Sequence, residues 1–267
     1  MKNVLVLMHQ DEGQEARFQA GLDLARALDG HLICLDVAVM PATVGDYMTF
    51  GGEALLIADS QQRERENRAH MEARLRVEGV PYDWTDATGY LSVTVHDKAA
   101  MADLIVLNRE LETTHYPDML EVVGETLVKG DKPIVAVPGG TRGFRAFGNA
   151  LIAWDGSPEA EAALRAAVPL LSLAREVHLV EVDDGSLATP ATEAAEYLSR
   201  HGIKPILRRT ASAIDVPSTL ILDAIAAVGA DYLVMGGFGH SRFLEAALGG
   251  VTRRMLKECP VPIFLAR

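Results

Sequence analysis

The feature that most constrains the fold of this chain is an internal repeat, because its two halves follow one plan. Each half opens with a short apolar run that ends in polar residues, at 3–11 and at 149–157. A pattern typical of a helix follows each run, at 16–28 and at 159–173. Self-similarity of this kind predicts two copies of one structural unit within a single chain.

The remaining segments of each half also have counterparts. A second apolar run follows the helical pattern, a later one is preceded by Ala-Asp, and a Pro-bounded run closes the half. The paired segments are 31–39 and 176–182, 102–107 and 230–235, and 132–138 and 261–266. Strand patterns that alternate with helical patterns indicate βαβ units, and near-continuous apolar strands indicate a parallel sheet with helices on both faces. The Gly- and Arg-rich segment 139–148 separates the halves, so we expect domains at 1–140 and 146–267.

Two neighbouring segments break the symmetry. Residues 41–56 have no counterpart of that length in the second half, and they are interpreted as a loop or a partly helical lid. Residues 60–78 predict a helix whose many charges recur at helical spacing. That spacing favours a solvated helix face with ion pairs.

Composition excludes several classes of function. The chain has 37 acidic and 25 basic residues, a formal net charge of −12, which argues against sequence-independent binding of nucleic acid. No segment approaches the roughly 20 apolar residues that span a bilayer, and the N-terminal apolar run is too short for a signal peptide. Cys34 and Cys259 stand in apolar surroundings without a zinc-binding pattern, which predicts buried thiols in a reducing compartment. We expect a cytoplasmic protein that binds neither nucleic acid nor membrane.

The most informative motif follows the apolar run at 230–235. Gly236 and Gly239 form a Gly-x-x-Gly pair, and after a nine-residue spacer Gly249 and Gly250 precede a helix predicted at 251–258. Glycines at a strand end allow positive φ and close approach of a ligand. Unpaired N–H groups at a helix N-terminus attract anions, phosphate above all. The alternative interpretation is a Gly-rich turn without a ligand.

These glycines, together with Asp155-Gly156-Ser157 after the first strand of the second half, make that half resemble a universal stress protein domain. The family's nucleotide signature is G-x-x-G, nine residues, then Gly followed by Ser or Thr. The order of strands and helices and the closing Pro-bounded strand are also similar, so the whole chain resembles a tandem member. The resemblance implies two open parallel five-stranded α/β sheets with helices on both faces, a role in stress responses, and, as in some members, ATP binding.

The resemblance implies a site in the second domain for ATP, alone or with Mg²⁺, or for another adenine nucleotide. Backbone groups near Ala153 and Val182 would contact the adenine. The expected site residues are Ala153, Asp155, Ser157, Val182, Met235, Gly236, Gly237, Gly239, His240, Gly249, Gly250, Val251 and Thr252. An N-cap role for the Asp-Gly-Ser-Pro segment is an equal alternative, and both roles can hold together. His240 fits a solvent-facing loop equally well, and Arg253 and Arg254 are expected at the surface.

The chain departs from the family pattern in two places. Gly250 replaces the Ser or Thr of the signature, so a hydroxyl is lost that Thr252 could supply. In the first half, residues 9–11 and 108–111 replace the strand-end motifs, and only Gly124 resembles the second glycine step. Glutamates in the equivalent loop would repel phosphate. The first half is therefore predicted to be a degenerate nucleotide site.

Three functions remain open from the sequence. The chain could be a nucleotide-binding regulatory module, a nucleotide-free scaffold that binds partners or a small hydrophobic ligand, or a slow ATPase. The sequence contains no P-loop, triad or paired catalytic carboxylates, so no catalytic residue and no metal site is predicted.

Two structural expectations follow. The closing strands would be exposed edges if left unpaired, so we expect the halves to pack as an intrachain pseudo-dimer, with a homodimer left open. Valine at Gly236 or Gly249 should abolish nucleotide binding because a Cβ would fill the space that phosphate needs. Changes at Asn108 or Gly124 should leave binding intact.

Overall fold

The computed structural model describes residues 1–39, 52–109, 118–182, 189–210, 216–238 and 250–267, in which both halves show the same alternation of strands and helices. The first half contains β1 (Asn3–Leu7), α1 (Gln14–Ala27), β2 (His31–Val39), α2 (Gly52–Glu78), β3 (Tyr82–Gly89), α3 (Leu91–Lys98), β4 (Leu104–Asn108), α4 (Met119–Lys129) and β5 (Ile134–Val137). The second half contains β6 (Asn149–Trp154), α5 (Pro158–Leu171), β7 (Glu176–Val182), α6 (Ala191–Arg200), β8 (Ile206–Thr210), α7 (Pro217–Val228), β9 (Tyr232–Gly236), α8 (Gly250–Glu258) and β10 (Ile263–Ala266).

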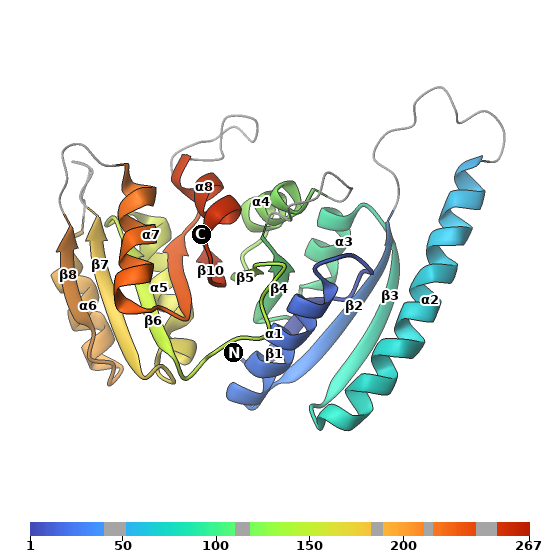
Figure 1. Ribbon diagram of the computed structural model, residues 1–267, viewed down its shortest axis with the longest axis horizontal. Helices are drawn as coiled ribbons and strands as arrows, with labels where there is room; N and C mark the ends of the chain where they lie inside the picture. Colours follow the sequence, from blue (N-terminus) through green and yellow to red (C-terminus); the bar gives the residue numbers. More distant parts are fainter. Residues whose placement is uncertain (40–51, 110–117, 183–188, 211–215, 239–249) are drawn as a thin grey trace.

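The strands of the two halves form one continuous sheet rather than two separate ones (Figure 1). Its order is β3-β2-β1-β4-β5-β10-β9-β6-β7-β8, so each half contributes five strands with its first strand at the centre. Strands within each half are parallel, whereas β5 and β10 are antiparallel, with Val135 opposite Phe264. The closing strands therefore cover each other's edges within the chain.

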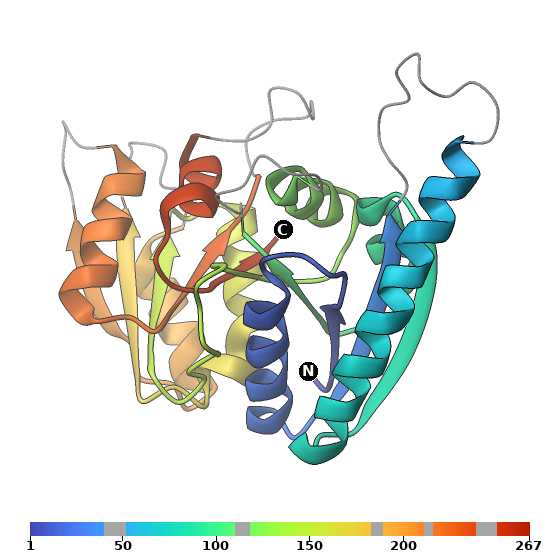
Figure 2. The ribbon, with the colours of Figure 1, turned by 45° about the vertical axis from the view of Figure 1, so that its right-hand side comes forward.

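Helices cover both faces of this sheet, as the apolar strands predict. Side chains of α1, α2, α5 and α6 pack with one face of the sheet, and those of α3, α4, α7 and α8 pack with the other. Figure 2 shows the blue helix α1 and the cyan helix α2 together on the near face of the first half. The strand ends of each half therefore lie between two helical layers.

The repeated Ala-Asp pair has a structural role in both halves. Asp103, just before β4, accepts hydrogen bonds from the backbone N–H groups of Lys2 (2.7 Å) and Asn3 (2.9 Å). These bonds hold the pKa of Asp103 below its usual value. In the second half Asp231 accepts from Asn149 N at 2.8 Å. Each aspartate thus fixes the start of the central strand beside the strand that it precedes.

The helix boundaries are close to those predicted, with one correction. Helix α2 begins at Gly52, so residues 52–56 of the predicted loop or lid are helical, while the rest of that segment lies outside the described residues. The predicted charged face of α2 is confirmed, since Arg63 pairs with Asp59 and Arg68 with Glu72. Its other face buries Met71 and Leu75 against the core.

Both cysteines are buried, as expected from their apolar surroundings. Burial raises the pKa of the Cys34 thiol to about 12 and that of Cys259 to about 11, which keeps both thiols protonated and unreactive at neutral pH. In the described part of the chain, no helix has the length and apolar character needed to cross a membrane.

Candidate functional site

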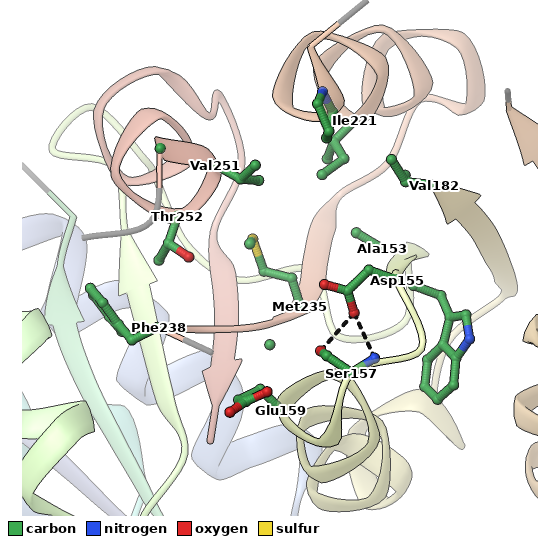
Figure 3. A pocket seen from close by; sticks show the side chains of 14 residues that line it. Ala153, Asp155, Ser157, Glu159, Val182, Ile221, Met235, Phe238, Val251 and Thr252 are labelled. Carbon is green, nitrogen blue, oxygen red and sulfur yellow. Dashed lines mark hydrogen bonds between the residues drawn. The ribbon is translucent and has the colours of Figure 1, made fainter. Parts of the chain in front are cut away.

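A cavity of about 160 Å³ lies at the C-terminal ends of β6, β7 and β9, beside the N-terminus of α8 (Figure 3). Ligands of open parallel sheets bind at this edge. Most of the expected site residues line the cavity, namely Ala153, Asp155, Ser157, Val182, Met235, Gly236, Gly250, Val251 and Thr252. Gly237 lies next to the cavity without lining it, and Gly239, His240 and Gly249 lie outside the described residues.

Asp155 and Ser157 perform the capping role that the sequence left open. Ser157 Oγ accepts from Ala160 N at 3.1 Å and so caps α5, with Pro158 in its first turn. Asp155 Oδ1 accepts from Ser157 N at 3.0 Å and from Ser157 Oγ at 2.6 Å. Gly156 has φ of 72°, which favours glycine in this turn. Figure 3 shows the other carboxylate oxygen of Asp155 directed into the cavity, so capping leaves this oxygen available and the ligand role stays a prediction.

Gly236 is required by packing inside the protein. A Cβ at this position would lie 2.6 Å from Ala160 N and 2.6 Å from the carbonyl carbon of Glu159, both in the first turn of α5. Packing therefore requires glycine here independently of any ligand, because glycine lets α5 begin directly against the end of β9. The sequence-based reason for this glycine, space for a phosphate, stays a prediction. At Gly237 a Cβ would lie 2.7 Å from Leu127 Cδ2, which belongs to the first half.

The N-terminus of α8 forms another wall of the cavity. Gly250 is the first helical residue, and a Cβ there would have no atom within 4 Å. Thr252 is buried, and Figure 3 shows its hydroxyl directed toward the cavity. Arg253 is exposed, as expected, whereas Arg254 is half-buried and bonds to Ser218 Oγ (3.2 Å) and Thr219 Oγ1 (2.8 Å) on α7. This wall therefore presents backbone N–H groups and one hydroxyl.

The structure adds residues that the sequence did not indicate. Pro217 and Ile221 on α7 line the cavity beside Val182 and Met235, and they complete an apolar slot. Glu159 and Phe238 also line it, and Phe238 has a left-handed φ of 62° although it is only 3% exposed. In the sequence these residues look like ordinary members of helices, strands and loops, so nothing marks them as cavity residues. Phe238 is the exception, because its place between Gly236 and Gly239 could have suggested an unusual backbone conformation.

Comparison with known protein families gives the family of the half of the chain that contains this cavity. A family model described as the Universal stress protein family matches residues 146–267. This half is a universal stress protein domain. A search of curated proteins found no match for the chain.

The universal stress protein fold extends over the whole chain. The structure is similar to a universal stress protein from Archaeoglobus fulgidus, with a TM-score of 0.77 and 17% identity over 99% of this chain and 96% of that one. It is also similar to a Pseudomonas aeruginosa protein assigned to the same family, with a TM-score of 0.60 and 14% identity over 99% of this chain and 92% of that one. At these identities the likeness shows the fold, which is therefore the tandem arrangement of this family.

The first universal stress protein-like half has an arginine at the equivalent strand ends. Arg17 on α1 is fully buried, and its Nε donates to Leu7 O at 2.7 Å while Nη2 donates to His9 O at 2.6 Å. Its Nη1 donates to both carboxylate oxygens of Asp11 at 2.8 Å and also to Asn108 Oδ1. The guanidinium thus joins the ends of β1 and β4 from inside the protein. Sequence reasoning missed Arg17, which looks like a surface residue of an amphipathic helix.

Asn108 and Gly13 reverse the packing seen in the universal stress protein domain. Asn108 ends β4 as Gly236 ends β9, and its side chain is buried against the start of α1. A Cβ at Gly13 would lie 2.1 Å from Asn108 Oδ1. The contact between the strand end and the helix start therefore needs a glycine in both halves. In the first half the glycine precedes the helix, at Gly13, and in the second half it ends the strand, at Gly236.

The helix after β4 begins with a carboxylate of the chain itself. Asp118 is the N-cap of α4 and accepts from Leu120 N at 3.0 Å and Glu121 N at 3.2 Å. Gly124 lies inside α4, so its predicted likeness to the glycine step before α8 is wrong. Because Asp118 occupies two of the N–H groups that would attract an anion, α4 does not present the open N-terminus that α8 presents among the residues the structure describes.

Proposed function

We propose that the second half binds an adenine nucleotide, with ATP as the first candidate, and that the protein acts as a regulatory module in a stress response. The observation that carries the proposal is the cavity itself, in which Asp155, Gly236 and the start of α8 meet at the C-terminal edge of the sheet. This is the edge at which open α/β sheets bind ligands. The family of the second half supports the stress-related role.

Each part of ATP has a chemically suitable counterpart in the cavity. The apolar slot of Val182, Ile221 and Met235 suits the adenine ring. The free carboxylate oxygen of Asp155 can accept from ribose hydroxyls, and the N-terminus of α8 with Thr252 can receive phosphate. Glu159 also lines the cavity, and its charge would oppose that of a triphosphate. We therefore expect Mg²⁺ to strengthen ATP binding by offsetting that repulsion.

Binding without rapid turnover fits these residues best. Hydrolysis needs a positioned base and groups that neutralise charge on the transferred phosphoryl group. Asp155 is instead held by two hydrogen bonds to Ser157, and Arg254 is directed to α7. We infer that any hydrolysis is slow and that the bound nucleotide is a signal.

Calorimetric titration with ATP and adenosine tests the proposal. We expect wild-type protein to bind both, and Thr252→Val to weaken ATP about tenfold, the cost of roughly 1.4 kcal/mol for one hydrogen bond to a charged oxygen, while adenosine is unchanged. The matched control is Thr126→Val on α4, which removes a buried hydroxyl without a partner among the described residues. Absence of ATP and adenosine binding to wild type, together with no nucleotide in native mass spectra of fresh protein, would refute the proposal and favour a nucleotide-free scaffold.

A further inference from the structure

Helix α8, whose N-terminus forms one wall of the nucleotide cavity, packs against both halves of the chain. On one side it contacts α7 of its own half, where Arg254 bonds to Ser218 and Thr219. On the other side it contacts α4 of the first half, and Figures 1 and 2 show the red α8 beside the green α4. The first half therefore belongs to the surroundings that hold this wall in place.

A guanidinium group of the first half reaches the C-terminal end of α8. Arg109 directly follows β4, and its Nη1 donates to Lys257 O. Lys257 lies in the last turn of α8, where carbonyl groups have no N–H donor within the helix. A cation at this end supplies a donor and interacts favourably with the negative end of the helix dipole. Its charge also acts on Cys259, the residue after α8, where it opposes the rise that burial causes in the thiol pKa.

A second contact joins the first half to the N-terminal end of α8. Gly237 directly follows β9, and a Cβ at this position would lie 2.7 Å from Leu127 Cδ2 on α4 and 3.9 Å from Thr252 Cγ2 on α8. The space left by the missing side chain is therefore bordered both by α4 and by Thr252, whose hydroxyl is directed toward the cavity. The first half thus packs close to both ends of α8.

The two halves make this crossing contact differently. Asn108 ends β4, and Gly236 ends β9. The residues that follow, Arg109 and Gly237, are therefore equivalent, and each meets the corresponding helix of the other half. Because glycine has no side chain, the second half cannot make the same hydrogen bond to α4 from this position. The guanidinium contact therefore runs in one direction, from the first half to the helix at the nucleotide cavity.

We propose that Arg109 is a positioning residue for the phosphate end of the nucleotide cavity and acts through α8. The inference rests on the proposed nucleotide function, and it makes the first half a determinant of phosphate affinity in the second. Helix α8 has nine residues, and helices this short depend on caps and tertiary contacts for their stability. Loosening at Lys257 therefore reaches the N–H groups and Thr252 at the other end. The adenine slot is formed by side chains of β7, α7 and β9, so it depends less on this contact.

Calorimetric titration of the full-length protein with ATP and with adenosine tests the inference. Arg109→Met keeps an unbranched side chain and removes the donors and the charge. We expect ATP affinity to fall by roughly three- to tenfold, while adenosine affinity changes by less than about twofold. Amide hydrogen exchange without ligand should become faster in α8 and stay unchanged in α5. Circular dichroism verifies that the variant is folded.

Arg26→Met is the matched control. Arg26 Nη2 donates to Glu78 O at 3.1 Å, at the last residue of α2, so the same kind of contact is made at another helix C-terminus. Among the described residues, α2 contributes none to the nucleotide cavity. The control also removes one positive charge from the first half, so it separates the position of α8 from the total charge of the protein. Both ligands should bind it as they bind wild type.

Four results would overturn the inference. They are unchanged ATP affinity in folded Arg109→Met, equal losses of ATP and adenosine affinity in that variant, unchanged exchange in its α8, and an equal loss of ATP affinity in Arg26→Met. If wild type bound neither ATP nor adenosine, the proposed function would fail and this inference with it. Any of the four results beside a wild type that binds ATP removes this inference alone.

Discussion

The ends of the central strands differ most between the two halves. In the second half, Gly236 lies against the start of α5 and Ser157 caps that helix, and a cavity remains above β6 and β9. In the first half, Arg17 and Asn108 extend into the equivalent region, and Asp118 caps the helix that follows. The comparison teaches that the same backbone fold can leave a cavity at the ends of its central strands, or can fill that region with side chains that hydrogen-bond to the strand ends. A few side chains decide between these outcomes.

The largest effect should come from removing the internal guanidinium of the first half. Arg17→Ala leaves Asp11 and two backbone carbonyls without their donor in a buried place, so we expect the free energy of unfolding to fall by about 3–5 kcal/mol. Glu161→Ala, at the equivalent place on α5, removes a surface pair with Arg165 and a hydrogen bond from Thr189 Oγ1 (3.1 Å), and should cost about 1 kcal/mol or less. Urea denaturation measures both. Similar losses in the two variants would contradict the contrast between the halves.

The next largest effect should follow from closing the glycine contact of the second half. Gly236→Ala places a Cβ against the backbone of α5, and we expect about 1–3 kcal/mol of destabilisation together with at least a tenfold loss of ATP affinity. Asn108→Ala, at the equivalent strand end, should leave ATP affinity unchanged when measured by calorimetry on folded protein. If the two substitutions weakened ATP equally, the proposed asymmetry of binding would be wrong.

A smaller effect should distinguish two buried acids at equivalent strand positions, Asp36 on β2 and Glu181 on β7, by the pH dependence of the free energy of unfolding. The folded protein holds the proton of Asp36 up to about pH 9, whereas the unfolded chain releases it near 3.8, so wild type loses stability as pH rises between these values. Asp36→Asn should therefore raise the free energy of unfolding by about 1–3 kcal/mol at pH 8 and change it little at pH 4. Glu181→Gln, which weakens a satisfied pair, should lower stability by about 1 kcal/mol at pH 8. Thermal denaturation at both pH values decides, and a destabilising Asp36→Asn at pH 8 would show that Asp36 is satisfied in wild type.

The smallest effect on stability should come from Gly250→Ser, which restores the hydroxyl of the family signature. The position has room for a side chain, and serine at a helix start should stabilise the fold by a few tenths of a kcal/mol over glycine. The hydroxyl could give ATP one more hydrogen bond to a charged oxygen, worth roughly 1.5–3 kcal/mol at best. Calorimetry should show tighter ATP and unchanged adenosine. Unchanged ATP affinity would mean that Thr252 already fills this role or that the phosphates lie elsewhere.

Much of the fold was readable from local patterns. The repeat, the alternation of strands and helices, and the repeated aspartates before β4 and β9 record interactions that recur along the chain in a fixed order. The family signature around Gly236 likewise indicated strand ends at which the structure has a cavity. These features are predictable because backbone preferences and apolar periodicity act over short sequence distances.

The site was predicted less completely because its walls come from distant segments. Ile221 and Pro217 belong to an ordinary apolar helix, and they become cavity residues only when α7 packs beside β7. The role of Gly236 was assigned to the ligand, although the start of α5 is what requires it. A sequence motif specifies which residue type occupies a position, whereas the atoms that contact that residue depend on tertiary packing.

The sequence by itself determined that this protein has two α/β units, that each builds a parallel sheet, and that the second half carries the glycine motif of its family. Only the tertiary structure decided that Arg17 occupies the strand ends of the first half, and that Asp36 on β2 lies opposite Asp86 on β3 whereas Glu181 on β7 lies opposite Arg209 on β8. The physical reason is the range of the interactions. Propensity and periodicity are fixed by neighbours along the chain, whereas the satisfaction of a buried charge depends on groups brought together from separate strands and helices.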